Sequence, residues 1–162
     1  MNKLSFIAGF VIMALLALEV RAMPNPWTDC GEDINCGAEI AGFNFPLKVE
    51  NYTVRAMKDM FEFRFSLDDT RSVIVRKSEM PGGEADENGI IDISGDYNTY
   101  PINKTITLEN SVKFSVKGEE DNYRVVNFAA ESGYYSIICD EGLSLNDIEY
   151  FYKLLEDAEA PK

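Results

Sequence analysis

The clearest pattern in the chain is an alternation of aromatic and polar residues over positions 60–66. Phe61, Phe63 and Phe65 fall on one face of an extended segment, and the polar residues between them fall on the other. Similar strand-like runs lie on either side, at 52–57 and 71–77. With short turns between the runs, the pattern predicts an antiparallel meander with one buried face.

The second half of the chain contains further strand-like runs, at 104–108, 112–116, 123–128 and 133–138. Turns rich in Gly or Asn separate them, which is typical of hairpins. Residues 80–101 differ because they are rich in Gly, Asp, Asn and Tyr and show little periodicity. We expect a long loop there, of the kind that often carries function. Before the first strand, residues 23–28 resemble an extended leader.

Two helices are expected at the ends of this strand-rich region. Residues 34–41 predict a short helix that Gly42 terminates. Ser144 and Asp147 form a capping box, and Leu143 and Ile148 form a hydrophobic staple, at the start of a C-terminal helix. The apolar stripe of that helix, expected to pack on the open face of the sheet, comprises Leu145, Ile148, Phe151, Tyr152 and Leu155.

The order of elements predicts an α+β domain over residues 23–162. It would be a single curved antiparallel sheet of about seven strands, with a short N-terminal helix and a C-terminal amphipathic helix packed on it. No Walker motif or Gly-x-Gly-x-x-Gly motif is present, and no alternation of strand and helix predicts a parallel nucleotide-binding sheet.

Residues 1–22 have the pattern of a secretory signal peptide. Lys3 is followed by a nearly unbroken apolar run to Val20, and cleavage is expected after Ala22. A retained anchor is the alternative, but the run is shorter than the roughly 20 residues that a spanning helix needs. We therefore expect an extracytoplasmic protein, periplasmic or secreted, without a retained membrane span.

Composition narrows the function classes further. The chain carries 15 Lys+Arg against 28 Asp+Glu, a formal net charge of −13, which disfavours nucleic acid and anionic membranes as partners. It contains no His, the commonest general base and a frequent ligand of transition metals. Ser-His-Asp and Cys-His catalysis are thereby excluded, which leaves carboxylates, Lys or Tyr for any catalytic role.

Three cysteines are present, and an oxidising compartment favours at least one disulfide. A bond between Cys30 and Cys36, which would close a small loop, is the default expectation. The alternatives are that Cys139 pairs with one of these two, or that Cys139 is a small buried apolar residue within a strand.

The loop contains one pattern that resembles a calcium site. Glu84, Asp86 and Asn88 match the first ligand positions of an EF-type loop, and Asp92 matches the ninth. Gly95 occupies the place of the final bidentate Glu, and no helices flank the segment. Calcium is thus the one cofactor that the sequence suggests, and a solvated acidic loop is the favoured interpretation. Neither a catalytic residue nor an organic cofactor is predicted.

Tyr97 and Tyr100 lie in the polar and aromatic segment 93–100. Their rings could bind a sugar or a peptide by stacking, or they could pin the loop to the sheet. We favour the second role and keep both residues as candidate ligand-binding positions.

Several segments resemble a family of small secreted bacterial proteins of unknown function. They are Asn25-Pro26-Trp27 followed by Cys30, the helix end Ala41-Gly42-Phe43, the segment 93–98, and Ser132 to Ser136 before the C-terminal helix. More distantly, such domains are similar to the extracytoplasmic sensor portions of anti-sigma-type membrane proteins and to the curved sheets of lipoprotein carriers. The resemblance implies no known activity and no functional residues.

These observations favour a non-enzymatic extracytoplasmic domain that binds a protein, a peptide or an envelope component. A carboxylate-dependent glycan hydrolase is one alternative, and it requires two carboxylates that converge in a cleft. A lipid-type carrier is the other, and it requires an enclosed apolar cavity beneath the C-terminal helix.

Overall fold

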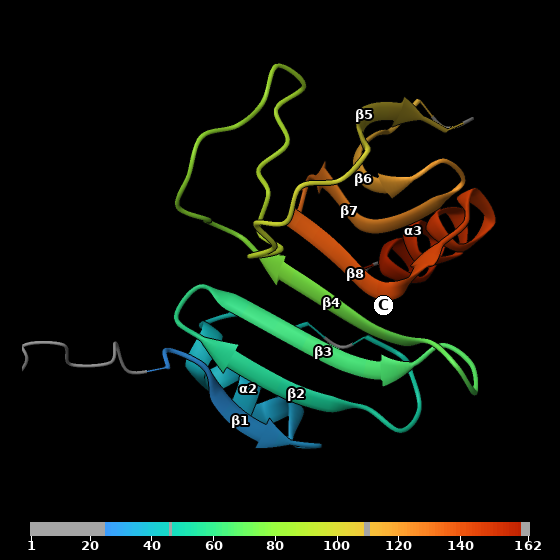
Figure 1. The fold of residues 1–162 in the computed structure, drawn as a ribbon. Coiled ribbons are helices and arrows are strands. Elements are labelled where there is room, and N and C mark those ends of the chain that lie inside the picture. Colours follow the sequence, from blue (N-terminus) through green and yellow to red (C-terminus); the bar gives the residue numbers. More distant parts are fainter. Residues whose placement is uncertain (1–24, 46, 109–110, 160–162) are drawn as a thin grey trace, which may run out of the picture.

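The computed structural model describes residues 25–45, 47–108 and 111–159, and the predicted signal peptide lies outside them. One antiparallel sheet of eight strands, in the order β1-β2-β3-β4-β8-β7-β6-β5, forms the body of the protein (Figure 1). The strands are β1 (Thr28–Gly31), β2 (Thr53–Met57), β3 (Met60–Ser66), β4 (Ser72–Ser78), β5 (Ile102–Thr107), β6 (Lys113–Glu119), β7 (Asn122–Ala130) and β8 (Gly133–Leu143). Two helices, α2 (Ile34–Ala41) and α3 (Leu145–Glu159), complete the described fold.

The predicted meander is confirmed as β2, β3 and β4. Phe61, Phe63 and Phe65 all point into the core, where they are at most 7% exposed. After β4 the chain passes through the long loop at 79–101 to β5, at the far edge of the sheet. It then returns through β6 and β7, so that β8 pairs with β4 and joins the two halves.

The sheet has eight strands and not about seven. The strand that the sequence prediction missed is β1, which pairs with β2 through Thr28↔Ala56 and Asp29↔Arg55. It is only four residues long, carries no apolar alternation, and has an irregularity between Asp29 and Gly31. A strand this short and polar depends on its neighbour, since its own sequence gives little signal.

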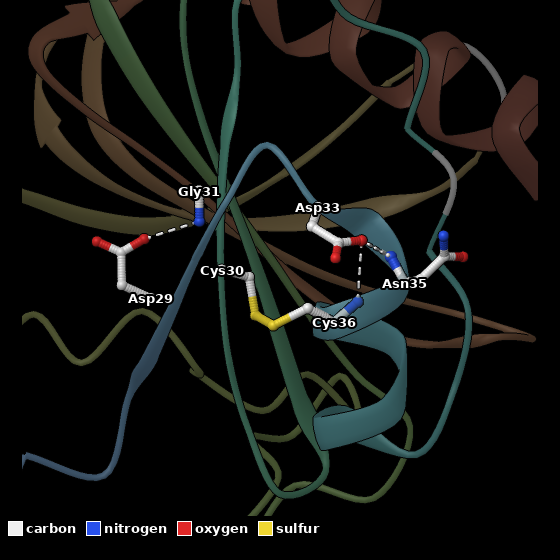
Figure 2. The surroundings of a disulfide bond; sticks show 6 residues. All are labelled: Asp29, Cys30, Gly31, Asp33, Asn35 and Cys36. Atoms are coloured by element: carbon white, nitrogen blue, oxygen red, sulfur yellow. Dashed lines mark hydrogen bonds between the residues drawn. A yellow bond between two sulfur atoms is a disulfide. The ribbon is translucent and has the colours of Figure 1, made fainter.

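Helix α2 occupies the residues that the sequence predicted. The carboxylate of Asp33 accepts the backbone N–H groups of Asn35 and Cys36 and so caps the first turn (Figure 2). Gly42 ends the helix at φ 86°, a left-handed conformation that suits glycine. The expected disulfide between Cys30 and Cys36 is present and ties β1 to α2.

The capping box of α3 is confirmed by two reciprocal hydrogen bonds. Ser144 N donates to Asp147 Oδ2 (2.9 Å), and Asp147 N donates to Ser144 Oγ (3.2 Å). Ile148, Phe151 and Leu155 are buried against the sheet, but Leu145 is 42% exposed. The predicted stripe was therefore wrong at Leu145, the first residue of α3, whereas Ile148 in the same turn is fully buried.

Aromatic rings fill the space between α3 and the sheet. Phe151 contacts Phe65, with 6.1 Å between the ring centroids, and Tyr152 contacts Phe114 and Phe128 at 5.7 Å. None of the helices in the described part of the chain is long and apolar enough to span a membrane.

Candidate functional site

The sheet face opposite the phenylalanines carries a polar row that crosses all eight strands. The pairing registers place one polar residue from each strand side by side. In sheet order these are Asp29, Arg55, Glu62, Arg76, Ser136, Asn127, Ser115 and Thr105. Each residue is unremarkable in its own strand, and only the topology brings the eight together.

Glu62 lies in the middle of a group of charged side chains on this face. Its side chain is fully buried, at 0% exposure. Arg64 Nε donates to Glu62 Oε1 at 2.6 Å, and Arg76 Nε donates to Glu62 Oε2 at 2.8 Å. Arg55 Nη1 lies 3.7 Å from Oε1. Three guanidinium groups thus surround one carboxylate, and we call Trp27, Arg55, Glu62, Arg64 and Arg76 the arginine cluster.

Trp27, the only tryptophan of the chain, packs against this cluster. Its ring lies 5.4 Å from the guanidinium carbon of Arg55 and 5.0 Å from that of Arg76. Both distances are within the range of cation–π attraction. The segment before β1 is therefore anchored by charged groups on the outer sheet face and not by the apolar core.

Arg76 connects the cluster to the long loop. Its Nη1 donates to the carbonyl oxygens of Ile93 (3.3 Å) and Ser94. A Cβ atom at Gly95 would lie 3.0 Å from the same nitrogen, and Gly95 has φ +64°. The loop is consequently held close above the arginine cluster at residues 93–95.

Short-range hydrogen bonds stiffen the loop beyond this anchor. Asp92 Oδ1 accepts from Ser94 N (2.8 Å), Ser94 Oγ accepts from Asp96 N (3.1 Å), and Asp96 Oδ1 accepts from Asn98 N (2.7 Å). Each side chain accepts the backbone N–H two residues ahead, as in Asx and Ser/Thr turns. This explains why an acidic, aperiodic segment has a defined path without helix or strand.

The loop carboxylates are stabilised in their charged form. Burial alone would raise the pKa of Asp92, but hydrogen bonds from Lys117 and Ser94 outweigh it and lower that pKa. The pKa of Asp96 is also lowered, because hydrogen bonds from Tyr100 and Asn98 outweigh the effect of its burial. Both residues are therefore anions at neutral pH.

The candidate calcium residues make hydrogen bonds and ion pairs with other protein groups. Asp86 Oδ1 accepts the N–H groups of Asn88 and Ile90, and Asn88 bonds the side chains of Thr105 and Lys113 on the sheet. Asp92 is paired with Lys117, and Glu84 is exposed. Within the described residues, His, Cys, Asp and Glu form no group of three that could hold a metal ion.

The two candidate tyrosines have different environments. Tyr100 is partly buried, and its hydroxyl donates to Asp96 Oδ2 at 2.6 Å, which raises the pKa of Tyr100. This hydrogen bond joins two residues of the same loop, and the role of pinning the loop to the sheet stays a prediction. Tyr97 is 96% exposed, so its ring packs on almost nothing in the described protein. The loop therefore presents one aromatic ring to solvent, two residues beyond the point where Gly95 lies against Arg76.

Cys139 is a free and buried thiol in β8. Burial raises its pKa, and Sγ lies 3.6 Å from the carbonyl oxygen of Gly142. A protonated thiol within the sheet agrees with the interpretation of Cys139 as a small apolar core residue.

Surface hollows among the described residues lie away from the arginine cluster. One of about 620 Å³ is lined by residues that include Lys48, Glu50 and Tyr150. Two adjoining grooves of about 440 and 470 Å³ flank the β7–β8 hairpin. Glu131 lines both grooves, together with Glu79 in one and Glu156 in the other.

Comparison of the chain with protein-family models, with curated proteins and with solved structures finds no match. The resemblance to small secreted bacterial proteins stays a prediction.

Proposed function

We propose that this protein is a non-enzymatic binding domain that works outside the cytoplasm and recognises a protein, a peptide or an envelope component. The observation that carries the proposal is Tyr97, 96% exposed on a loop that Arg76 holds at its base. An exposed ring on a fixed support loses little conformational entropy when it binds, so it is well suited to be a contact residue.

The composition of the surrounding surface supports this choice. Tyr, Trp and Arg are the residue types most enriched at binding hot spots. One region of the protein contains all three types, in Tyr97, Trp27, Arg55 and Arg64. Gly95 contacts Arg76 of the arginine cluster, and Tyr97 lies within about 7 Å of Gly95 along the chain. We call Tyr97 and the arginine cluster together the recognition face.

The Cys30–Cys36 disulfide supports an extracytoplasmic location, since such bonds form and persist in oxidising compartments. The filled interior favours surface recognition over carriage of a lipid. Phe65 and Phe151, with their neighbouring rings, occupy the space beneath α3 that an apolar ligand would need.

The test is binding of envelope material to the purified mature chain with its disulfide intact. Detergent-extracted envelope proteins, envelope peptides and insoluble cell-wall material would be applied in separate arms to immobilised protein. We expect saturable binding in one arm, weakened roughly 30-fold by Tyr97→Ala, since a hot-spot aromatic contributes about 2 kcal/mol. Tyr150→Ala is the matched control, because Tyr150 is 53% exposed on α3 and lies outside the recognition face.

Absence of binding in every arm, or equal loss in the two tyrosine variants, would overturn the proposal. A hydrolase remains a second candidate because Glu131 lines two adjoining grooves with a second carboxylate in each. Glycan hydrolysis that is lost in Glu131→Gln and kept in Tyr97→Ala would favour that candidate instead.

A further inference from the structure

The arginine cluster has more positive charge than its own carboxylate neutralises. Arg55, Arg64 and Arg76 all lie within 3.7 Å of an oxygen of Glu62. Three cations face this one anion, and Asp29, in register with Arg55 on β1, adds a second carboxylate to the same face, so a smaller positive excess remains in a chain whose formal net charge is −13.

The excess is not spread equally over the three arginines. Arg76 already donates to acceptors within the protein, namely Glu62 and two loop carbonyls. Arg64 donates to Glu62 only through Nε, so its terminal nitrogens have no acceptor among the described residues. Arg55 makes one ion pair at 3.7 Å, stacks on Trp27, and donates no hydrogen bond within the described part of the chain.

These two arginines are also the accessible ones. The side chains of Arg55 and Arg64 are 22% and 39% exposed, while that of Arg76 is 14% exposed. They project from the neighbouring strands β2 and β3 and approach the same oxygen, Glu62 Oε1. Both arginines therefore keep unused N–H donors while they approach the same carboxylate oxygen, and part of each side chain is exposed.

We infer that Arg55 and Arg64 form a binding site for a single carboxylate group of a ligand. A guanidinium presents its N–H donors in a planar fork that matches the two oxygens of a carboxylate. The negative charge of the whole chain disfavours a ligand with many charges, so one isolated carboxylate is the fitting class. Glu62 holds both arginines in place from beneath, and Trp27 holds Arg55 from the side.

This inference rests on the proposed function, because it names the chemistry by which the recognition face would hold a ligand. It adds that the ligand is anionic at one point and that Tyr97 packs beside that point. Neither statement is needed for the recognition face to bind something.

Trp27 provides an internal reporter, because it is the only tryptophan and it packs against Arg55. The probe is N-acetyl-alanyl-alanine, and the matched ligand control is its C-terminal amide, which lacks only the charge. We expect a saturable change of tryptophan emission with the carboxylate and none with the amide, at constant ionic strength.

Arg55→Gln and Arg64→Gln should each weaken this binding about tenfold or more, since each removes a charged hydrogen-bond donor. Lys104→Gln is the control variant, because it removes one positive charge on β5, where Lys104 pairs with Glu120. Equal responses to carboxylate and amide, or unchanged binding in both arginine variants, would overturn the inference.

A measurement on the unmodified protein keeps the inference testable if a variant does not fold. In nitrogen-15 spectra the side-chain Nε–H signals of Arg55 and Arg64 should shift with the carboxylate probe. That of Arg71, held by Asp68 and Asp147, should stay unchanged and serves as the reference. If the Nε–H signals of Arg55 and Arg64 do not shift when the carboxylate probe is added, the proposed site is contradicted. If the envelope material still bound through Tyr97, the proposed function would stand without it.

Discussion

The guanidinium of Arg76 and the carboxylate of Glu62 lie side by side on β4 and β3, with Arg76 Nε 2.8 Å from Glu62 Oε2 and Glu62 fully buried. This pair connects the sheet to the long loop, because the same arginine donates to the carbonyl of Ile93. A buried ion pair is weak evidence for stability by itself. Here it places the loop that carries the exposed ring of Tyr97.

Glu62→Gln is expected to destabilise the protein by about 3–5 kcal/mol, because it leaves neighbouring guanidinium groups without their counter-ion. Chemical denaturation measures this change. Glu149→Gln is the matched control, since Glu149 pairs with Lys153 on the exposed side of α3 and should cost less than about 0.5 kcal/mol. Similar effects of the two substitutions would show that Glu62 does not organise the cluster.

Reduction of the Cys30–Cys36 disulfide should lower stability by about 2 kcal/mol, which is the loop-entropy estimate for so short a closed loop. Thermal unfolding with and without reductant provides the comparison. Cys139→Ser separates the contribution of the free thiol from that of the disulfide. A melting temperature that reductant does not change would mean that β1 and α2 are held together without this bond.

Gly37→Ala should destabilise the protein by about 1–3 kcal/mol, despite the better helix propensity of alanine. A Cβ atom there would lie 2.6 Å from one ring atom of Phe61 and from a methyl group of Val54. Gly82→Ala is the control, because a Cβ atom at Gly82 meets nothing within 4 Å. Unaltered stability of Gly37→Ala would indicate that α2 packs less closely on β2 and β3 than described.

The loop carboxylates predict a specific dependence of stability on pH. The pKa values of Asp92 and Asp96 are lowered in the folded protein, so their ionisation contributes stability above their ordinary pKa of about 3.9. That contribution is lost as the pH falls through the lower folded-state pKa values.

Asp92→Asn should therefore be less stable than the wild type at neutral pH, and the difference should narrow as the medium is acidified below about pH 4. Denaturation midpoints of both proteins, measured across this pH range, test whether the stability difference narrows on acidification. A difference that is independent of pH would mean that the pairing of Asp92 with Lys117 contributes no charge-dependent stability.

Much of the fold follows from local patterns, and the recognition face does not. The alternation around Phe63 and the capping box of Ser144 are local signals, and both predicted their elements correctly. Glu62 looks like an ordinary polar position on an exposed face, yet it is buried because the topology places Arg55 and Arg76 on its two neighbouring strands.

The loop shows the same limit of local reasoning. Spacing alone makes Asp92 a calcium candidate, which stays a prediction, and it gives no sign that the oxygens of Asp92 accept hydrogen bonds from Ser94 and from Lys117 on β6. The lysine is distant in sequence and contributes no local signal. Similarly, no pattern distinguishes Tyr97 from Tyr100, because only the hydrogen bond of Tyr100 to Asp96 separates their roles.

Hydrogen exchange in the presence of the envelope fraction that binds this protein tests the central claim most directly. We predict slower exchange of backbone amides in loop residues 93–100 and along β2 and β3, because these segments form the recognition face. Exchange in α3 and at the β7–β8 hairpin should not change. Protection confined to α3, or to the grooves beside Glu131, would contradict the account and place the binding surface elsewhere on the protein.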